Sequence, residues 1–159
     1  MRLYLIRHGK AERGSHSGRD DDRELAPRGH RQAEWLGAVL RKDDSPPDRI
    51  IASPAARAAR TAGLIAETLG LGVESNDAIG LRTTPSGVLA LIQGSSDGKA
   101  LALVGHNPTL SDLASVLVHG VAARGQIGLR TGQAAVLDLD QPSDPIGTAT
   151  LLDLLRLED

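Results

Sequence analysis

Apolar residues along this chain gather into short continuous runs and into stripes that recur every three or four positions. Three of the runs, at residues 3–6, 49–52 and 100–104, end at a charged, polar or glycine residue. Such runs are typical of strands buried on both faces in a parallel sheet. Residues 134–139 and 148–155 are two further strand candidates. The Pro- and Gly-containing connector between them favours antiparallel pairing at the edge of the sheet.

Apolar stripes predict a helix after each of the first three runs. The spacing indicates helices from residue 27 to about 42, from Ser53 to Gly70, and from Asn107 to about Leu117. Ser53 and Asn107 are each followed by proline, so we expect them to cap their helices while the proline presets the first turn.

The remaining segments are read from composition. Residues 9–24 are rich in Gly, Ser, Asp and Arg without an apolar period, which predicts an exposed loop. A short strand around Val73 and a helix over residues 86–93 are weaker predictions. Because strands alternate with helices, we expect an α/β protein built as a three-layer α/β/α sandwich. Its central sheet should be mostly parallel with an antiparallel edge.

Composition narrows the class of protein. A chain of 159 residues suits a single domain over residues 1–159. With 18 Lys and Arg against 20 Asp and Glu, the net charge of −2 gives no drive toward nucleic acid or a membrane surface. The absence of cysteine excludes disulfides and thiolate chemistry. Since no 18-residue apolar run occurs and charge interrupts residues 1–7 too early for a signal peptide, we expect a cytoplasmic protein.

Candidate chemistry stands where the three buried strands end. The first strand is followed by Arg7, His8 and Gly9, the second leads to Arg57, and the third leads to His106. Ligands of open α/β sheets bind beyond the carboxyl ends of the strands. Arginine forks and helix N-termini suit a phosphate group, and Gly9 would let the backbone pass close to it. If the three strands are neighbours, the sequence predicts a phosphate pocket.

Taken singly, these residues have ordinary structural interpretations. His106 could be a satisfied structural histidine, Arg57 a solvated helix residue and Arg7 an edge charge. Their joint occurrence at three strand ends favours the pocket. The other histidines lack the spacing of a metal site and are interpreted as surface or helix residues: His16, His30 and His119.

Four segments also stand in a characteristic order: Arg7-His8-Gly9, residues 25–33, residues 53–62 and Gly105-His106-Asn107-Pro108. In order and spacing they resemble the histidine phosphatase superfamily, which includes the cofactor-dependent phosphoglycerate mutases. The resemblance spans roughly residues 1–120, and the short chain is most similar to the compact SixA branch of phosphohistidine phosphatases. It implies a phosphoglycerate mutase-like fold and an enzyme in which a histidine is phosphorylated transiently.

Carried onto this sequence, the resemblance makes His8 the nucleophile, with Arg7, Arg57 and His106 holding the phosphoryl group. Attack on phosphorus needs a neutral imidazole, so one ring nitrogen of His8 should donate its proton to a fixed acceptor while the other faces the substrate. We expect a protonated His106 to share in balancing the phosphoryl charge, with no metal and no cofactor. Further residues expected to bind substrate are Gly9, Asn107, Asp20, Asp21 and Asp22.

The expected proton donor is missing. Larger members of the superfamily have a glutamate where this chain offers Gly80. A general acid is worth roughly 10²–10⁴-fold, so its absence favours good leaving groups such as phosphohistidine and aryl phosphates. Each acidic residue near the pocket in sequence could be the proton donor or, equally, a solvated surface charge. These residues are Asp20, Asp21, Asp22, Glu24, Glu74 and Asp77.

The sequence therefore predicts a metal-independent phosphatase that acts on phosphohistidine protein or on small phosphomonoesters. One alternative is a phosphoglycerate mutase-type phosphotransferase. The chain has little room for the insertions that enclose a small sugar acid in such an enzyme. Another is a non-catalytic phosphoprotein-docking module, which would not need His8 as a nucleophile. Substrate choice is expected to come from the loops over residues 14–24 and 79–85.

Overall fold

The computed structural model describes residues 1–158, which form one six-stranded sheet in the order β3-β2-β4-β1-β5-β6. Strands β3, β2, β4 and β1 run parallel, whereas β5 pairs antiparallel with β1 and with β6. The strand bounds are Arg2–Arg7 (β1), Arg49–Ala52 (β2), Glu74–Ser75 (β3), Ala100–Gly105 (β4), Ala134–Leu139 (β5) and Ala149–Leu155 (β6).

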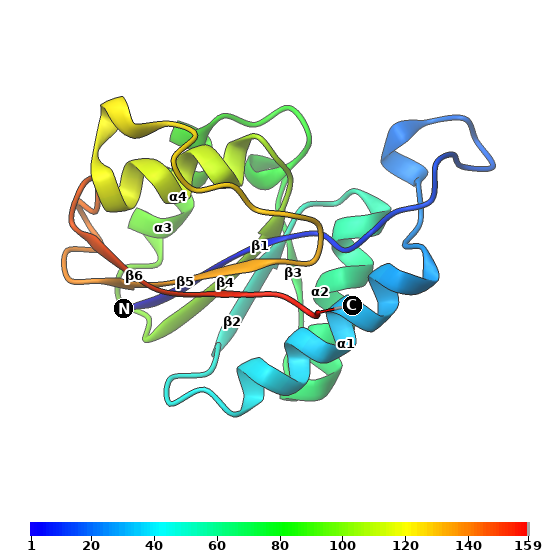
Figure 1. The fold of residues 1–159 in the computed structure, drawn as a ribbon, viewed down its shortest axis with the longest axis horizontal. Coiled ribbons are helices and arrows are strands. Elements are labelled where there is room, and N and C mark those ends of the chain that lie inside the picture. Colours follow the sequence, from blue (N-terminus) through cyan, green and yellow to red (C-terminus); the bar gives the residue numbers. More distant parts are fainter. Residues whose placement is uncertain (159) are drawn as a thin grey trace.

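Helices cover both faces of the sheet, with α1 and α2 on one side and α3 and α4 on the other (Figure 1). Their bounds are Pro27–Arg41 (α1), Ala56–Leu69 (α2), Pro85–Gly94 (α3) and Thr109–His119 (α4). Short 3-10 turns occur at Asp20–Asp22 (η1), Asp77–Ile79 (η2) and Val121–Ala123 (η3). The fold is the predicted α/β/α sandwich with an antiparallel edge.

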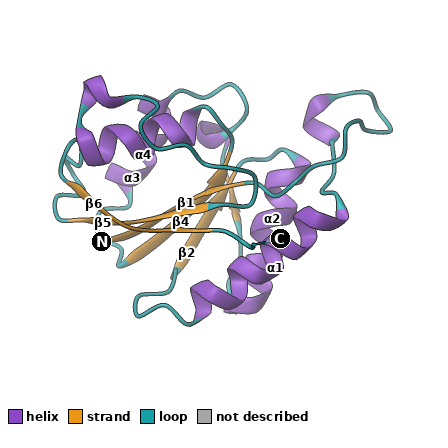
Figure 2. Ribbon diagram, in the orientation of Figure 1, coloured by secondary structure: helices purple, strands orange, loops and turns teal. Residues whose placement is uncertain are grey.

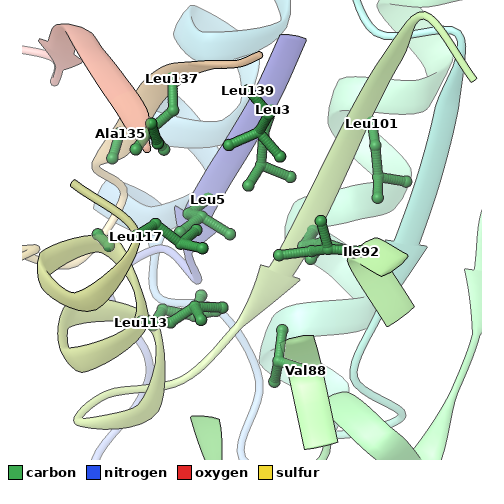
Figure 3. Packing of buried hydrophobic residues seen from close by; sticks show 14 of the residues in the cluster. Leu3, Leu5, Val88, Ile92, Leu101, Leu113, Leu117, Ala135, Leu137 and Leu139 are labelled. Atoms are coloured by element: carbon green, nitrogen blue, oxygen red, sulfur yellow. The ribbon is translucent and has the colours of Figure 1, made fainter. Parts of the chain in front are cut away.

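Alternation along the central strands divides the apolar side chains between two core layers. Leu3 and Leu5 of β1 pack toward α3 and α4, and Figure 3 shows Leu5 near Leu117 of α4. Tyr4, between the two leucines, packs on the other face toward α1 and α2. Because aromatic residues make up only 1% of the chain, leucine, isoleucine, valine and alanine fill both layers.

The long loop between β1 and α1 extends beyond the sheet on the side of α1 and α2 (Figure 2). It contains η1, which contacts α2, and an isolated bridge between Ala11 and Leu25 closes the base of the loop. The loop therefore lies close to the carboxyl ends of the parallel strands.

Only one of the two expected helix caps is wrong. Helix α2 begins at Ala56, and the hydroxyl of Ser53 accepts from the N–H of Ala55, before the helix, at 3.2 Å. The side chain of Ser53 therefore comes too early to satisfy an N–H group of the first helical turn. Asn107 also precedes its helix, which begins at Thr109, but its Oδ1 accepts from the N–H of Ser111 in the first turn of α4 at 3.3 Å.

Candidate active site

The sheet order brings the three predicted strand ends together. Strand β4 lies between β2 and β1, and Arg7 pairs in register with Gly105, the residue before His106. The rings of His8 and His106 lie with their centroids 5.2 Å apart. Arg7, His8, Arg57 and His106 all line one cavity of about 290 Å³, which Lys10, Arg23, Asn107 and Thr131 also line. The two arginines and two histidines therefore converge as the motifs predict.

His8 is held as a neutral imidazole whose unprotonated nitrogen is Nε2. Its Nδ1 lies 2.8 Å from the carbonyl oxygen of Gly9, and its Nε2 accepts a hydrogen bond from Nε of Arg57 at 3.3 Å. A carbonyl can only accept, so Nδ1 carries the proton. Burial lowers the pKa of His8 to about 4, and the positive charges of Arg57 and Arg7 lower this pKa further, against the Gly9 carbonyl.

Arg57 is 4% exposed, and all three nitrogens of its guanidinium group donate hydrogen bonds. Besides the contact from Nε to His8, Nη1 donates to the backbone oxygen of Asp20 at 2.7 Å and Nη2 donates to its carboxylate at 3.0 Å. Arg23 binds the other oxygen of that carboxylate at 2.9 Å. Burial disfavours the charged carboxylate, but hydrogen bonds from Arg23 and Arg57 outweigh it and lower the pKa of Asp20. Asp20 therefore contacts the pocket through Arg57.

Arg7 and Asn107 share an anchor. Nη1 of Arg7 and Nδ2 of Asn107 both donate to the backbone oxygen of Leu129, at 3.1 and 2.7 Å. Ser111 completes the network, because its hydroxyl donates to Oδ1 of Asn107 and accepts from the N–H of Leu129. Within residues 1–158, Nε of Arg7 is buried without a hydrogen-bond partner. Arg7 thus has a donor left for an anion in the cavity, whereas the amide of Asn107 is already occupied.

His106 is neutral in the free protein, whereas the sequence leads us to expect a protonated ring beside a bound phosphoryl group. The side chain is 6% exposed, and burial together with His8, Arg57 and Arg7 lowers the pKa of His106 to about 3. Its Nε2 lies 2.8 Å from Oγ of Ser53. Nδ1 is buried and has no hydrogen-bond partner among the described residues 1–158. A further positive charge beside the guanidinium groups of Arg7 and Arg57 is unfavourable, so the ring is uncharged while no anion is bound.

Position 9 requires glycine for close backbone packing against α1, which differs from the expected close approach to a bound phosphate. A Cβ there would lie 2.8 Å from the backbone oxygen of Gly29 in α1, and a Cβ on Gly29 would lie 2.2 Å from the backbone oxygen of Lys10. The two glycines therefore let the segment after β1 cross the start of α1. The N–H of Gly9 donates to Oγ1 of Thr61, which itself donates to the carbonyl of Arg57.

A second cavity, of about 550 Å³, adjoins the first through Leu81, which lines both. Asp21 and Asp22 of η1 line it together with Asp77 and Gly80. Residues from both loops expected to select the substrate thus face this cavity.

Other candidate acids lie elsewhere. Glu74 pairs with Arg49, whose Nε and Nη2 lie 2.5 and 2.9 Å from its two carboxylate oxygens. Arg49 opens β2 at its amino end, so this ion pair is on the wrong side of the sheet for Glu74 to serve the pocket. Glu24 lines a separate open hollow with residues 12–17. The acids that remain near His8 are Asp20, which binds Arg57, and Asp21, Asp22 and Asp77, which line the adjoining cavity.

Sequence reasoning missed several residues that build the site. Thr61 and Gln32 both lie inside the quoted motifs; Oε1 of Gln32 accepts from the N–H of Lys10 at 2.9 Å. Their place in those motifs was the available signal. Nothing in the sequence marks Leu129, which acts through its backbone oxygen.

The described residues contain neither a membrane-spanning helix nor a cluster of metal-ligating side chains. No helix within residues 1–158 is long and apolar enough to cross a membrane. Among the same residues, no group of three or more His, Asp or Glu side chains is placed to hold a metal ion.

A mostly parallel sheet with this strand order, and with histidines and arginines at its carboxyl edge, defines the class of phosphoglycerate mutase-like α/β proteins. The family model of the histidine phosphatase superfamily (branch 1) matches residues 3–81. The chain belongs to that superfamily, many of whose members are phosphatases.

Three proteins are similar to this chain over most of its length. A protein of Picosynechococcus sp. is 30% identical over 147 residues, which are 86% of this chain and 88% of the relative. The proposed phosphohistidine phosphatase SixA of Agrobacterium tumefaciens is 28% identical, with a TM-score of 0.78 over 97% of each chain. The protein histidine phosphatase SixA complexed with tungstate is 21% identical and shares the fold, with a TM-score of 0.83 over 98% of this chain and 97% of that one.

Proposed function

We propose that this protein is a metal-independent phosphatase that works through a phosphohistidine on Nε2 of His8. Its substrates are phosphohistidine proteins or small phosphomonoesters with good leaving groups. The observation that carries the proposal is the state of His8: Nδ1 is committed to the Gly9 carbonyl, and Nε2 keeps its lone pair in a cavity lined by Arg7, Arg23 and Arg57.

In the first half-reaction, the Nε2 lone pair attacks phosphorus as the bond from phosphorus to the leaving group breaks. The phosphorylated ring keeps its proton on Nδ1 and becomes positively charged, which strengthens the hydrogen bond to the Gly9 carbonyl. Arg7 and Arg57 balance the charge on the phosphoryl oxygens. Arg57 must turn its Nε–H from His8 to an incoming oxygen.

In the second half-reaction, water attacks phosphorus and the bond to Nε2 breaks. The water gives up a proton, the ring regains its neutral state, and inorganic phosphate leaves. Over the cycle, a phosphate ester and water become an alcohol and phosphate, so no group remains on the protein. All the positive charge that this scheme requires comes from Arg7 and Arg57.

The substrate preference follows from the second cavity. Gly80 supplies no proton donor there, and Asp21, Asp22 and Asp77 face this cavity from the 3-10 turns η1 and η2. Leaving groups that depart without strong protonation help are therefore favoured. The likeness to a protein described as a phosphohistidine phosphatase supports phosphohistidine as one such substrate.

Hydrolysis of an aryl phosphate in excess chelator tests the proposal. The unmodified protein should turn over with chelator present, and His8→Ala should not. His119→Ala is a matched control, because His119 is exposed at the end of α4. If the unmodified protein binds inorganic phosphate but releases no product from aryl phosphates or phosphohistidine proteins, the chain is a docking module instead. Activity that chelator abolishes would contradict metal independence.

A further inference from the structure

Ser53 connects the end of β2 to the second histidine of the site. It is 1% exposed, and its N–H donates to the carbonyl of Val104 on the neighbouring strand at 3.0 Å. Its hydroxyl oxygen lies 3.2 Å from the N–H of Ala55 and 2.8 Å from Nε2 of His106. Both the backbone and the hydroxyl of Ser53 are thus held in place beside His106.

Hydrogen-bond capacity favours one direction for the second contact. The N–H of Ala55 can only donate, so the hydroxyl oxygen of Ser53 accepts it. The hydroxyl has one proton to give, and within residues 1–158 the one acceptor that its contacts provide is Nε2 of His106. Donation to Nε2 pairs that buried proton, whereas a proton on Nε2 would leave the hydroxyl proton without an acceptor. Nε2 is therefore favoured as the acceptor, which puts the proton of a neutral His106 ring on Nδ1.

We propose that Ser53 is a positioning residue that fixes His106 in the Nδ1-protonated tautomer, so that a neutral His106 donates a hydrogen bond to the phosphoryl group. The proposal rests on the proposed function for the identity of the bound group. The position of the proton is inferred from the contacts of Ser53 and does not depend on that function.

The surroundings of His106 fit this assignment. Its Nδ1 is the buried ring nitrogen that has no partner among the described residues, while the ring lines the phosphate cavity beside His8. The low pKa of His106 agrees with an uncharged ring next to Arg7 and Arg57. A neutral imidazole N–H can polarise an oxygen without adding another positive charge to the cavity. Ser53 determines which ring nitrogen carries that N–H.

Long-range ¹H–¹⁵N correlation spectra of the unmodified protein measure the tautomer directly. At about pH 7, His106 should show a protonated Nδ1 and an unprotonated Nε2, with its signals assigned by their loss in His106→Gln. His8 should show the same tautomer for an independent reason, its contact with Gly9. A His106 ring that carries its proton on Nε2 in the unmodified protein overturns the proposal, whether or not any variant folds.

The variant Ser53→Ala tests the positioning step. Losing the hydroxyl should let His106 take up the other tautomer and weaken the binding of inorganic phosphate roughly tenfold. Ser53→Thr keeps a hydroxyl and should restore the tautomer. Ser95→Ala is the matched control, since Ser95 is a buried serine whose hydroxyl binds Arg49 instead. An unchanged tautomer and unchanged phosphate affinity in Ser53→Ala would overturn the role of Ser53.

These readouts separate the proposal from the proposed function. If His106 has the expected tautomer and Ser53→Ala weakens phosphate binding, the positioning role stands even where no substrate is turned over. In that case only the phosphatase assignment fails.

Discussion

Arg57 and His8 meet through the nitrogens that matter for phosphoryl transfer: Nε of the arginine donates to Nε2 of the histidine across 3.3 Å. The contact keeps a proton off the lone pair of Nε2, because an N–H already occupies that position. It also places a phosphate-binding group at the atom that we propose as the nucleophile. The guanidinium is held there by Asp20, which binds Nη1 and Nη2.

This geometry predicts that Arg57→Lys loses far more activity than a loss of charge would cause. Lysine keeps the positive charge but has a single nitrogen, so it cannot contact His8 and Asp20 together. We expect kcat/KM for an aryl phosphate to fall by roughly 10²–10³-fold. Arg60→Lys provides the matched control, since Arg60 lies on the same helix, exposed and paired with Glu67. Equal activities of the two variants would contradict the proposed role.

Asp20→Asn is predicted to tighten the binding of inorganic phosphate at low salt. The carboxylate competes with phosphate for the same guanidinium, and its charge repels the incoming anion. The asparagine keeps the shape, and the backbone oxygen of residue 20 still holds Nη1. Isothermal titration should show phosphate affinity rising by a few-fold to about tenfold. Asp22→Asn is the control, because that carboxylate accepts from Ser17 and not from Arg57.

The same variant tests Asp20 as the proton donor. If Asp20 protonates the leaving group, Asp20→Asn should lower kcat for substrates with poor leaving groups while phosphate affinity rises. If it acts only on Arg57, kcat should not depend on the leaving group differently from the unmodified protein.

The neutral histidines predict a loss of stability in mild acid. The folded-state pKa values of His8 and His106, about 4 and about 3, lie below the ordinary value of 6.5. Between pH 6.5 and 4, the unfolded chain therefore binds protons that the folded chain does not. The free energy of unfolding should fall as pH falls through this window, by up to about 1.4 kcal/mol per pH unit for each histidine. Above pH 6.5 neither residue contributes a pH dependence.

Urea unfolding at pH 7 and pH 5 measures this effect. The unmodified protein and His119→Ala should lose stability by the same amount, whereas His106→Gln should lose less by about 1–2 kcal/mol. Comparing the change with pH within each variant removes the cost of the substitution itself. An equal loss in His106→Gln would show that His106 titrates normally in the folded protein.

Sequence patterns predicted the fold well because local periodicity determines its main elements. The run at Arg49–Ala52 and the run at Ala134–Leu139 became strands with those bounds. The chemistry at the strand ends was also predictable, since the parallel order of β2, β4 and β1 places Arg57, His106 and His8 at one edge.

Features that depend on distant parts of the chain were not predictable. The carbonyl of Leu129 binds Arg7 across 122 positions of sequence, and no local pattern encodes that contact. The neutral state of His106 in the free protein was not predictable, because residue type alone does not show how fully a ring is buried among cations. The capping role of Ser53 failed for a related reason: its hydroxyl contacts His106, a partner from another strand end.

The absent glutamate at Gly80 gives the last prediction, a steep dependence of kcat/KM on the pKa of the leaving group. Without a strong proton donor, the leaving oxygen carries its own negative charge, so aryl phosphates should react faster than alkyl phosphates. A series of phosphomonoesters of graded leaving-group pKa measures the slope, and a flat series would contradict the prediction. Asp21→Asn and Asp77→Asn, compared in the same series, identify any partial donor in the second cavity. The variant that removes a working acid should steepen the slope, whereas an acid that only lines the cavity should leave it unchanged.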